Sequence, residues 1–263
     1  MRRLISFRCE GATLVGTLDE APGRTGLLIV SGGNELRMGA HRGMARLAQR
    51  LAMSGYPIFR FDRRGIGDSE GENHGFESSC SDIAHAAAAF RKAARLDRLV
   101  AFGNCDAATA LILFHDRAEI DALVLANPWL VPPAGDLPPP AAIRAHYAAR
   151  LRDPRQWLRL LRGGVNLAKL FKGLRATANT RSQDESLAAR AARALQRAVP
   201  TTLLIATGDH TAVAFLHEYR GARFDAVRRA IPIAQHDTAS HSFAGEGDKD
   251  WLFDRVLATL ETA

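Results

Sequence analysis

The stretch VAFGNCDAATAL, residues 100–111, decides how this sequence is organised. It begins as a short apolar run, passes through a tight turn at Cys105, and continues with small residues of helical character. The pattern predicts a buried strand, a sharp turn and the start of a helix. In such a turn the central residue is strained and exposed, and the residues two positions before and after it must be small. Gly103 and Ala107 meet that requirement.

Cys105 itself has two interpretations. A helix that begins directly after it would direct its N-terminal dipole at the sulfur and favour the thiolate, which is the nucleophilic form. A cysteine is also a small residue that fills protein cores without reacting. The turn alone leaves both interpretations open.

Strand-like and helical segments alternate on both sides of this stretch. A hairpin is predicted over 4–20, and further strands over 26–33, 56–62, 99–105, 120–128, 200–209 and 230–236. Helical patterns lie between them at 41–55, 78–96 and from 106 to about 115, and a last one covers 248–261. Strands separated by helices of this length indicate right-handed crossovers and a mostly parallel central sheet flanked by helices.

Residues 130–198 interrupt this alternation. The interruption opens with VPPAGDLPPP, which cannot continue a sheet, and only helical patterns follow. We therefore expect a core formed by 1–129 and 199–263, with a helical cap inserted over the edge of the sheet where open α/β folds bind ligands. An independent domain is the alternative, although the segment has few large apolar residues.

The predicted cap is strongly basic. Between Arg144 and Arg197 the sequence has eleven arginines and two lysines against three carboxylates, whereas the net charge of the whole chain is +7. Apolar residues edged by these cations suit an anionic amphiphile, such as a lipid-linked acyl substrate, or an anionic membrane surface. Solvated helix faces are the plainer alternative. The segment has no nucleic-acid recognition motif, so we expect no nucleic-acid partner.

Composition limits the remaining classes. The 263 residues are 47% hydrophobic and 24% charged, as in ordinary globular proteins. Three cysteines without regular spacing fit reduced thiols and predict a cytoplasmic protein. We expect no metal site and no cofactor, because metal-ligand spacings are missing from the sequence. The N-terminal stretch is too broken for a signal peptide, and no apolar run reaches the length of a membrane span.

Several motifs together resemble the α/β-hydrolase superfamily over nearly the whole chain. They are FDRRGIGDSEG at 61–71, GNCDA at 103–107, and a late acid and histidine. The resemblance implies an α/β-hydrolase fold with the helical cap between the sixth and seventh strands. It places Cys105 where such enzymes carry their nucleophile, usually serine. It also assigns the oxyanion-binding amides to Asp106 and to Gly33 or Asn34, in the loop after the third strand, where an ordinary glycine turn is the alternative.

The resemblance also implies a triad in the order nucleophile, acid, histidine. Two histidines follow the last strand, His236 and His241, and the residues alone leave the choice between them open. The usual position of the acid is Thr211, and the only carboxylate in that turn is Asp209, which could equally cap the following helix. The position after the sixth strand carries Asn127, which cannot serve as a carboxylate.

Two longer motifs are similar to the exosortase A system-associated hydrolase 1 family, whose members accompany exopolysaccharide and protein-sorting genes. They are SGGNELRMGAHR at 31–42 and LRDPRQWLRLLRGGVNLAKLFKGL at 151–174. The late histidine motif of that family matches SHSF at 240–243, which implies His241 rather than His236 as the base. Its acid motif keeps the spacing of Asp209 from Thr211.

We therefore expect a hydrolase that cleaves an ester, thioester or related acyl bond. Cys105 would attack, His241 would transfer the proton and Asp209 would orient the imidazole. Substrate contacts are expected from Asn34, His41 and Trp129. One alternative is an acyltransferase or thioesterase in exopolysaccharide or lipid assembly, because a thioester intermediate also reacts with amines and thiols. The other is a non-catalytic α/β-hydrolase homologue that binds a ligand under its cap.

Overall fold

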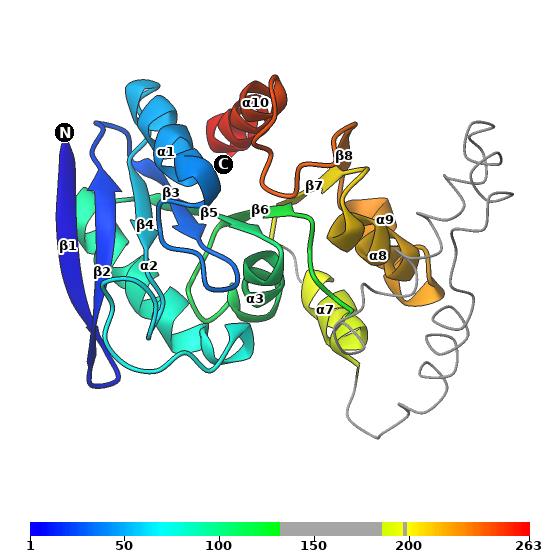
Figure 1. The fold of residues 1–263 in the computed structure, drawn as a ribbon, viewed down its shortest axis with the longest axis horizontal. Coiled ribbons are helices and arrows are strands. Elements are labelled where there is room, and N and C mark those ends of the chain that lie inside the picture. Colours follow the sequence, from blue (N-terminus) through cyan, green and yellow to red (C-terminus); the bar gives the residue numbers. More distant parts are fainter. Residues whose placement is uncertain (132–185, 197–198) are drawn as a thin grey trace, which may run out of the picture.

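The computed structural model describes residues 1–131, 186–196 and 199–263 (Figure 1). Eight strands form one sheet in the order β1-β2-β4-β3-β5-β6-β7-β8. Their bounds are β1 Arg2–Cys9, β2 Ala12–Asp19, β3 Thr25–Val30, β4 Ile58–Phe61, β5 Arg98–Asn104, β6 Ala122–Ala126, β7 Thr201–Ala206 and β8 Ile233–His236.

The sheet is mostly parallel, as the alternation of strands and helices predicts. β1 and β2 form the expected hairpin, and β2 also pairs antiparallel with β4. All the other neighbours, from β4 through β3 and β5 to β8, pair in parallel. The carboxyl ends of β3, β5, β6, β7 and β8 therefore meet at one edge, where open α/β sheets bind their ligands.

Helices cover both faces of the sheet. Helices α1 (Gly43–Met53) and α10 (Asp248–Thr262) pack on one face (Figure 1). The other face is covered by α2 (Cys80–Ala94), α3 (Asp106–Phe114), α7 (Leu187–Leu195), α8 (His210–Tyr219) and α9 (Asp225–Ala230). None of the helices in the described part of the chain is long and apolar enough to cross a membrane.

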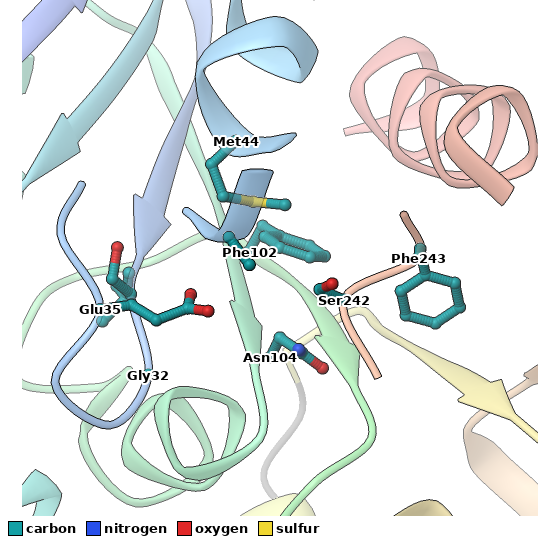
Figure 2. Close-up of a pocket in the computed structure, with 10 residues that line it drawn as sticks. Gly32, Glu35, Met44, Phe102, Asn104, Ser242 and Phe243 are labelled. Atoms are coloured by element: carbon teal, nitrogen blue, oxygen red, sulfur yellow. The ribbon is translucent and has the colours of Figure 1, made fainter. Parts of the chain in front are cut away.

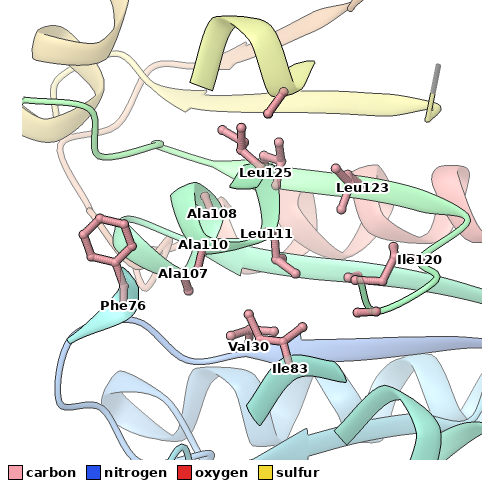
Figure 3. Packing of buried hydrophobic residues seen from close by; sticks show 14 of the residues in the cluster. Val30, Phe76, Ile83, Ala107, Ala108, Ala110, Leu111, Ile120, Leu123 and Leu125 are labelled. Carbon is pink, nitrogen blue, oxygen red and sulfur yellow. The ribbon is translucent and has the colours of Figure 1, made fainter. Parts of the chain in front are cut away.

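The buried side chains follow the periodicity that the sequence predicts. Helix α2 buries Ile83, Ala86, Ala87 and Phe90 along one stripe, and Phe90 stacks on Phe59 of β4 with 5.5 Å between ring centroids. Figure 3 shows the same cluster around α3, whose small residues allow the helix to lie close to the strands. This packing holds the turn between β5 and α3 in place.

Most of the predicted cap lies outside the described residues, because 132–185 and 197–198 are not described. The described part includes α7, whose helical pattern places it in the predicted cap. This helix packs against α3, and its residues Ala188, Ala191 and Ala192 are buried in the cluster that covers the sheet. The cap boundaries at 130 and 198 stay a prediction.

Candidate active site

The turn between β5 and α3 has the strained geometry that its sequence predicts. Cys105 has φ 62° and ψ −127°, which is unusual backbone for a residue with a side chain. A Cβ atom added to Gly103 would lie 2.8 Å from the carbonyl carbon of Ala107 and 2.9 Å from the nitrogen of Ala108. Only glycine at 103 allows α3 to start so close to the strand. The turn thereby lifts Cys105 to the edge of the sheet.

His241 lies beside this cysteine, although 136 positions separate them in the chain. Its Nδ1 atom is 3.0 Å from Oδ1 of Asp209. The hydrogen bond to Asp209, together with the interaction with the side chain of Cys105, raises the pKa of His241 to about 10, against burial. The structure thus brings Cys105, His241 and Asp209 together and favours the protonated imidazole.

Asp209 uses its two carboxyl oxygens for different tasks. Oδ1 faces His241, whereas Oδ2 accepts a hydrogen bond of 2.9 Å from the amide of Ala212 at the start of α8. Burial by itself would raise the pKa of Asp209. The hydrogen bond and charge of His241, with the amides of Ala212 and Thr211, instead lower it. The helix cap and the histidine partner are therefore the same residue, and Thr211 contributes its backbone.

Two asparagines hold the backbone of His241, and sequence reasoning missed this role. Asn104 Nδ2 and Asn127 Nδ2 both donate to the carbonyl oxygen of His241, at 3.0 and 3.2 Å. Asn127 is fully buried, and its Oδ1 accepts from the amide of Ala206 at 2.8 Å. A signal for this role was available in the sequence. Asn104 ends β5, and Asn127 directly follows the adjacent parallel strand β6. The sequence shows only that Asn127 cannot serve as the acid.

The loop after β3 approaches the start of α3 very closely. A Cβ atom on Gly32 would lie 2.6 Å from Oδ1 of Asp106 and 2.8 Å from the carbonyl oxygen of Asn104, so glycine is required there. The next amide, that of Gly33, donates to Oδ1 of Asp106 at 2.7 Å. Gly33 therefore lies next to the turn, as predicted for an oxyanion donor, but its N–H group is bound by the side chain of Asp106.

The three residues expected to contact substrate have different surroundings. Asn34 is exposed, and its Oδ1 accepts from Nδ2 of Asn73 at 2.9 Å. His41 is exposed in a helical turn, Ala40–Arg42, with φ 51°. Trp129 donates its amide to the carbonyl oxygen of Cys105 at 3.2 Å, and its ring stands edge-on to Phe76. Of the three, Trp129 has a hydrogen bond to the turn.

The other late histidine, His236, is engaged elsewhere. Its Nε2 atom lies 2.9 Å from Oδ1 of Asp248, which is buried at the start of α10. The imidazole also stacks on the ring of Trp251, with 4.7 Å between centroids and 11° between planes. His236 therefore fastens the end of β8 to α10.

A small cavity of about 20 Å³, enough for one water molecule, lies beside the loop after β3. Figure 2 shows Glu35, Asn104 and Ser242 among its polar lining residues, with Met44 and Phe102 on the apolar side. Burial raises the pKa of Glu35, and the nearby charge of His241 opposes that shift. Glu35 is thus a second carboxyl group near the histidine, and no sequence motif had singled it out.

Comparison of the sequence with known families agrees with this geometry. The profile of the family described as "Serine aminopeptidase, S33" matches residues 24–219. The chain belongs to this family. It is an α/β-hydrolase, which confirms the superfamily resemblance of its motifs. The family is named for a serine enzyme, whereas this hydrolase has Cys105 in the turn. No curated protein matches the sequence.

Solved structures share the fold over the whole chain. DcsB, solved with a substrate analogue, is 14% identical with a TM-score of 0.66, and the alignment covers 100% of this chain and 99% of that one. An esterase of Pyrococcus furiosus is 17% identical with a TM-score of 0.66, covering 100% and 91%. The thioesterase domain of a curacin biosynthetic pathway is 14% identical with a TM-score of 0.63, covering 98% and 99%. These likenesses establish the fold.

Proposed function

We propose that this hydrolase cleaves an ester, thioester or related acyl bond with a cysteine nucleophile. One observation carries the proposal: at a strained strand-to-helix turn, His241 interacts with the side chain of Cys105 and lies 3.0 Å from the carboxylate of Asp209. A nucleophile, a base that reaches it and a third group that orients the base are the parts that acyl transfer requires. The raised pKa of His241 supports a protonated imidazole beside the sulfur.

In the proposed reaction, Sγ of Cys105 attacks the acyl carbon and forms the sulfur–carbon bond. The electron pair of the carbonyl moves to its oxygen, which the amides of Asp106 and Gly33 bind. The tetrahedral intermediate collapses, and the leaving alkoxide or thiolate takes the proton from His241. Water then attacks the acyl-thioester while His241 accepts a proton from it. Expulsion of the Cys105 thiolate releases the acid and restores the starting state.

Thioester chemistry also favours an acyl-transfer alternative, since an amine or a thiol can replace water in the second step. Membership of the exosortase-associated family, supported by the motifs at 31–42 and 151–174, would place that transfer in exopolysaccharide or lipid assembly. A cytoplasmic location is proposed from the three free cysteines Cys9, Cys80 and Cys105. The engaged amide of Gly33 is the observation that favours a non-catalytic homologue.

Mass spectrometry after incubation with a p-nitrophenyl acyl ester tests the nucleophile. The expected result is one acyl group on Cys105 and none in Cys105→Ala. Limiting iodoacetamide should likewise label Cys105 before the other two thiols. Burial, helped by Asp82, raises the pKa of Cys9 to about 12, and burial raises that of Cys80. Equal labelling of all three cysteines in the folded protein would contradict the proposal.

An anionic substrate or surface is proposed from the basic sequence between 144 and 197, which lies mostly outside the described residues. Cations near a site strengthen the binding of anions, and salt screens that attraction. An anionic acyl ester should therefore lose its kcat/KM advantage over a neutral ester of equal chain length as NaCl rises to about 0.5 M. Vesicles of anionic and zwitterionic lipid provide the parallel test for a surface. If neither substrate preference nor vesicle binding depends on charge or salt, the plainer interpretation of this segment as solvated helix faces is favoured.

A further inference from the structure

The amide that the proposed reaction needs is already occupied by the protein itself. Oδ1 of Asp106 accepts a hydrogen bond of 2.7 Å from the N–H group of Gly33. We propose that Asp106 closes the oxyanion site in the free enzyme, and that Arg63 is the positioning residue that holds this carboxylate when the site opens. The inference rests on the proposed function, because it concerns the acylation of Cys105.

Arg63 is placed to accept this carboxylate. Its side chain is 4% exposed and lies under the loop after β3, where Nη2 donates to the carbonyl oxygen of Gly33. Nη2 is also 4.0 Å from Oδ2 of Asp106. The second terminal nitrogen, Nη1, is buried and has no hydrogen-bond partner within the described part of the chain. A buried donor without a partner costs free energy, so a carboxylate that moves toward it is stabilised.

Two effects make the present position of Asp106 unfavourable for catalysis. Its oxygen competes for the hydrogen bond that Gly33 would give to the substrate oxyanion. Its negative charge also lies next to the place where the oxyanion forms, and like charges there raise the barrier. If the carboxylate turns toward Arg63, it exchanges one amide hydrogen bond for a charge-assisted pair. It stays at the N-terminus of α3 in both positions, where a negative charge is favourable.

The rate of Cys105 acylation, followed by stopped-flow release of p-nitrophenol, tests the role of Asp106. Asp106→Ala should acylate about tenfold faster than the wild type, because a single oxyanion donor can change rates by about 10²–10³ and here it becomes free. Asp106→Asn should fall between them, since its amide oxygen still accepts from Gly33 but the charge is gone. A rate in Asp106→Ala at or below that of the wild type would overturn the proposal.

Arg63→Met, made in both backgrounds, separates a positioning role from a purely structural one. In the wild type it should slow acylation about tenfold, because the carboxylate loses its alternative partner. In Asp106→Ala the same change should alter the rate less than twofold, and Arg63→Lys should partly restore the wild-type rate. Equal slowing in both backgrounds would show that Arg63 only supports the fold and would overturn its role. If Arg63→Met does not fold, the Asp106 variants still decide whether Asp106 closes the oxyanion site.

The outcomes distinguish this inference from the proposed function. Acylation of Cys105 at rates that ignore the charge of residue 106 would refute the inference alone and leave the nucleophile in place. Failure to find an acyl group on Cys105 in the wild type and in every variant would refute the nucleophile, and the inference with it.

Discussion

Two histidine–aspartate pairs lie near the end of β8, and their separations are almost the same. His241 and Asp209 lie 3.0 Å apart, and His236 and Asp248 lie 2.9 Å apart. Both carboxylates are buried, and each begins or caps a helix that covers the sheet. The distance between a histidine and an aspartate therefore does not identify a catalytic pair.

The surroundings of the two pairs differ in what else each member touches. The side chain of His241 interacts with that of Cys105, the proposed nucleophile. The imidazole of His236 instead lies flat on Trp251. The second oxygen of Asp248 is bound by the hydroxyl of Thr238 and the amide of Gly245, which closes the loop on itself. One pair lies beside Cys105, the proposed nucleophile, and the other fastens the end of β8 to α10.

The largest expected difference between the pairs is in turnover. His241→Ala should lower kcat/KM for a p-nitrophenyl ester on the order of 10⁶-fold, because after loss of a triad histidine only binding and the oxyanion site still contribute to catalysis. His236→Ala should lower it less than tenfold, because the residue does not touch the reacting atoms. Steady-state kinetics of the two purified variants provide the measurement.

Unfolding curves of both variants are the control for this comparison, since a loss of turnover is informative only in a folded protein. A larger loss in His236→Ala than in His241→Ala, at equal stability, would exchange the roles of the two histidines and refute the choice made from the SHSF motif.

The fold could be predicted from the sequence because each of its elements depends on a pattern of neighbouring residues. The turn at Cys105 needs small residues at 103 and 107, and the alternation of strands and helices then requires parallel crossovers. α7 shows where this reasoning stops. An amphipathic helix has the same sequence pattern whatever its apolar face packs against, so the contact of α7 with α3 could not be predicted.

The site was predicted less completely, because its contacts join segments that are far apart in the chain. The sequence around Asp209 fits a helix cap and a histidine partner equally, and only the structure shows that its two oxygens do both. The bond between Gly33 and Asp106 depends on how closely a loop approaches a helix, which no motif records. Asn127 has no carboxylate and so cannot be the acid. Its role comes instead from its amide group, which donates to His241 and accepts from Ala206.

A smaller difference between the pairs should appear in the pH dependence of stability. The hydrogen bonds to Asp209 and Cys105 raise the pKa of His241 from 6.5 to about 10. The protonated imidazole therefore stabilises the fold fully below about pH 6.5, and this contribution is lost as the pH rises toward 10. The free energy of unfolding in urea should fall between pH 7 and pH 10 in the wild type and fall less in His241→Gln.

His74→Gln is a matched control for this pH series, because it removes an exposed histidine of the loop before α2. It should keep the wild-type slope. Identical slopes in the wild type and in His241→Gln would show that the pair with Asp209 and Cys105 does not stabilise the fold.

The smallest expected effect concerns the fastening pair. His236→Phe keeps an aromatic ring on Trp251 but removes the hydrogen bond to the buried Oδ1 of Asp248, which should cost about 1–3 kcal/mol. At about 2–4 °C per kcal/mol, a lower Tm should be measurable by calorimetry. Turnover should fall only a few fold, in kcat rather than KM, because the asparagines still hold the backbone of His241. The double variant His236→Phe, Asp248→Leu separates the two roles of this pair. If stability returns but turnover does not, the pair also orients the loop that carries His241. If both return, the pair only fastens β8 to α10.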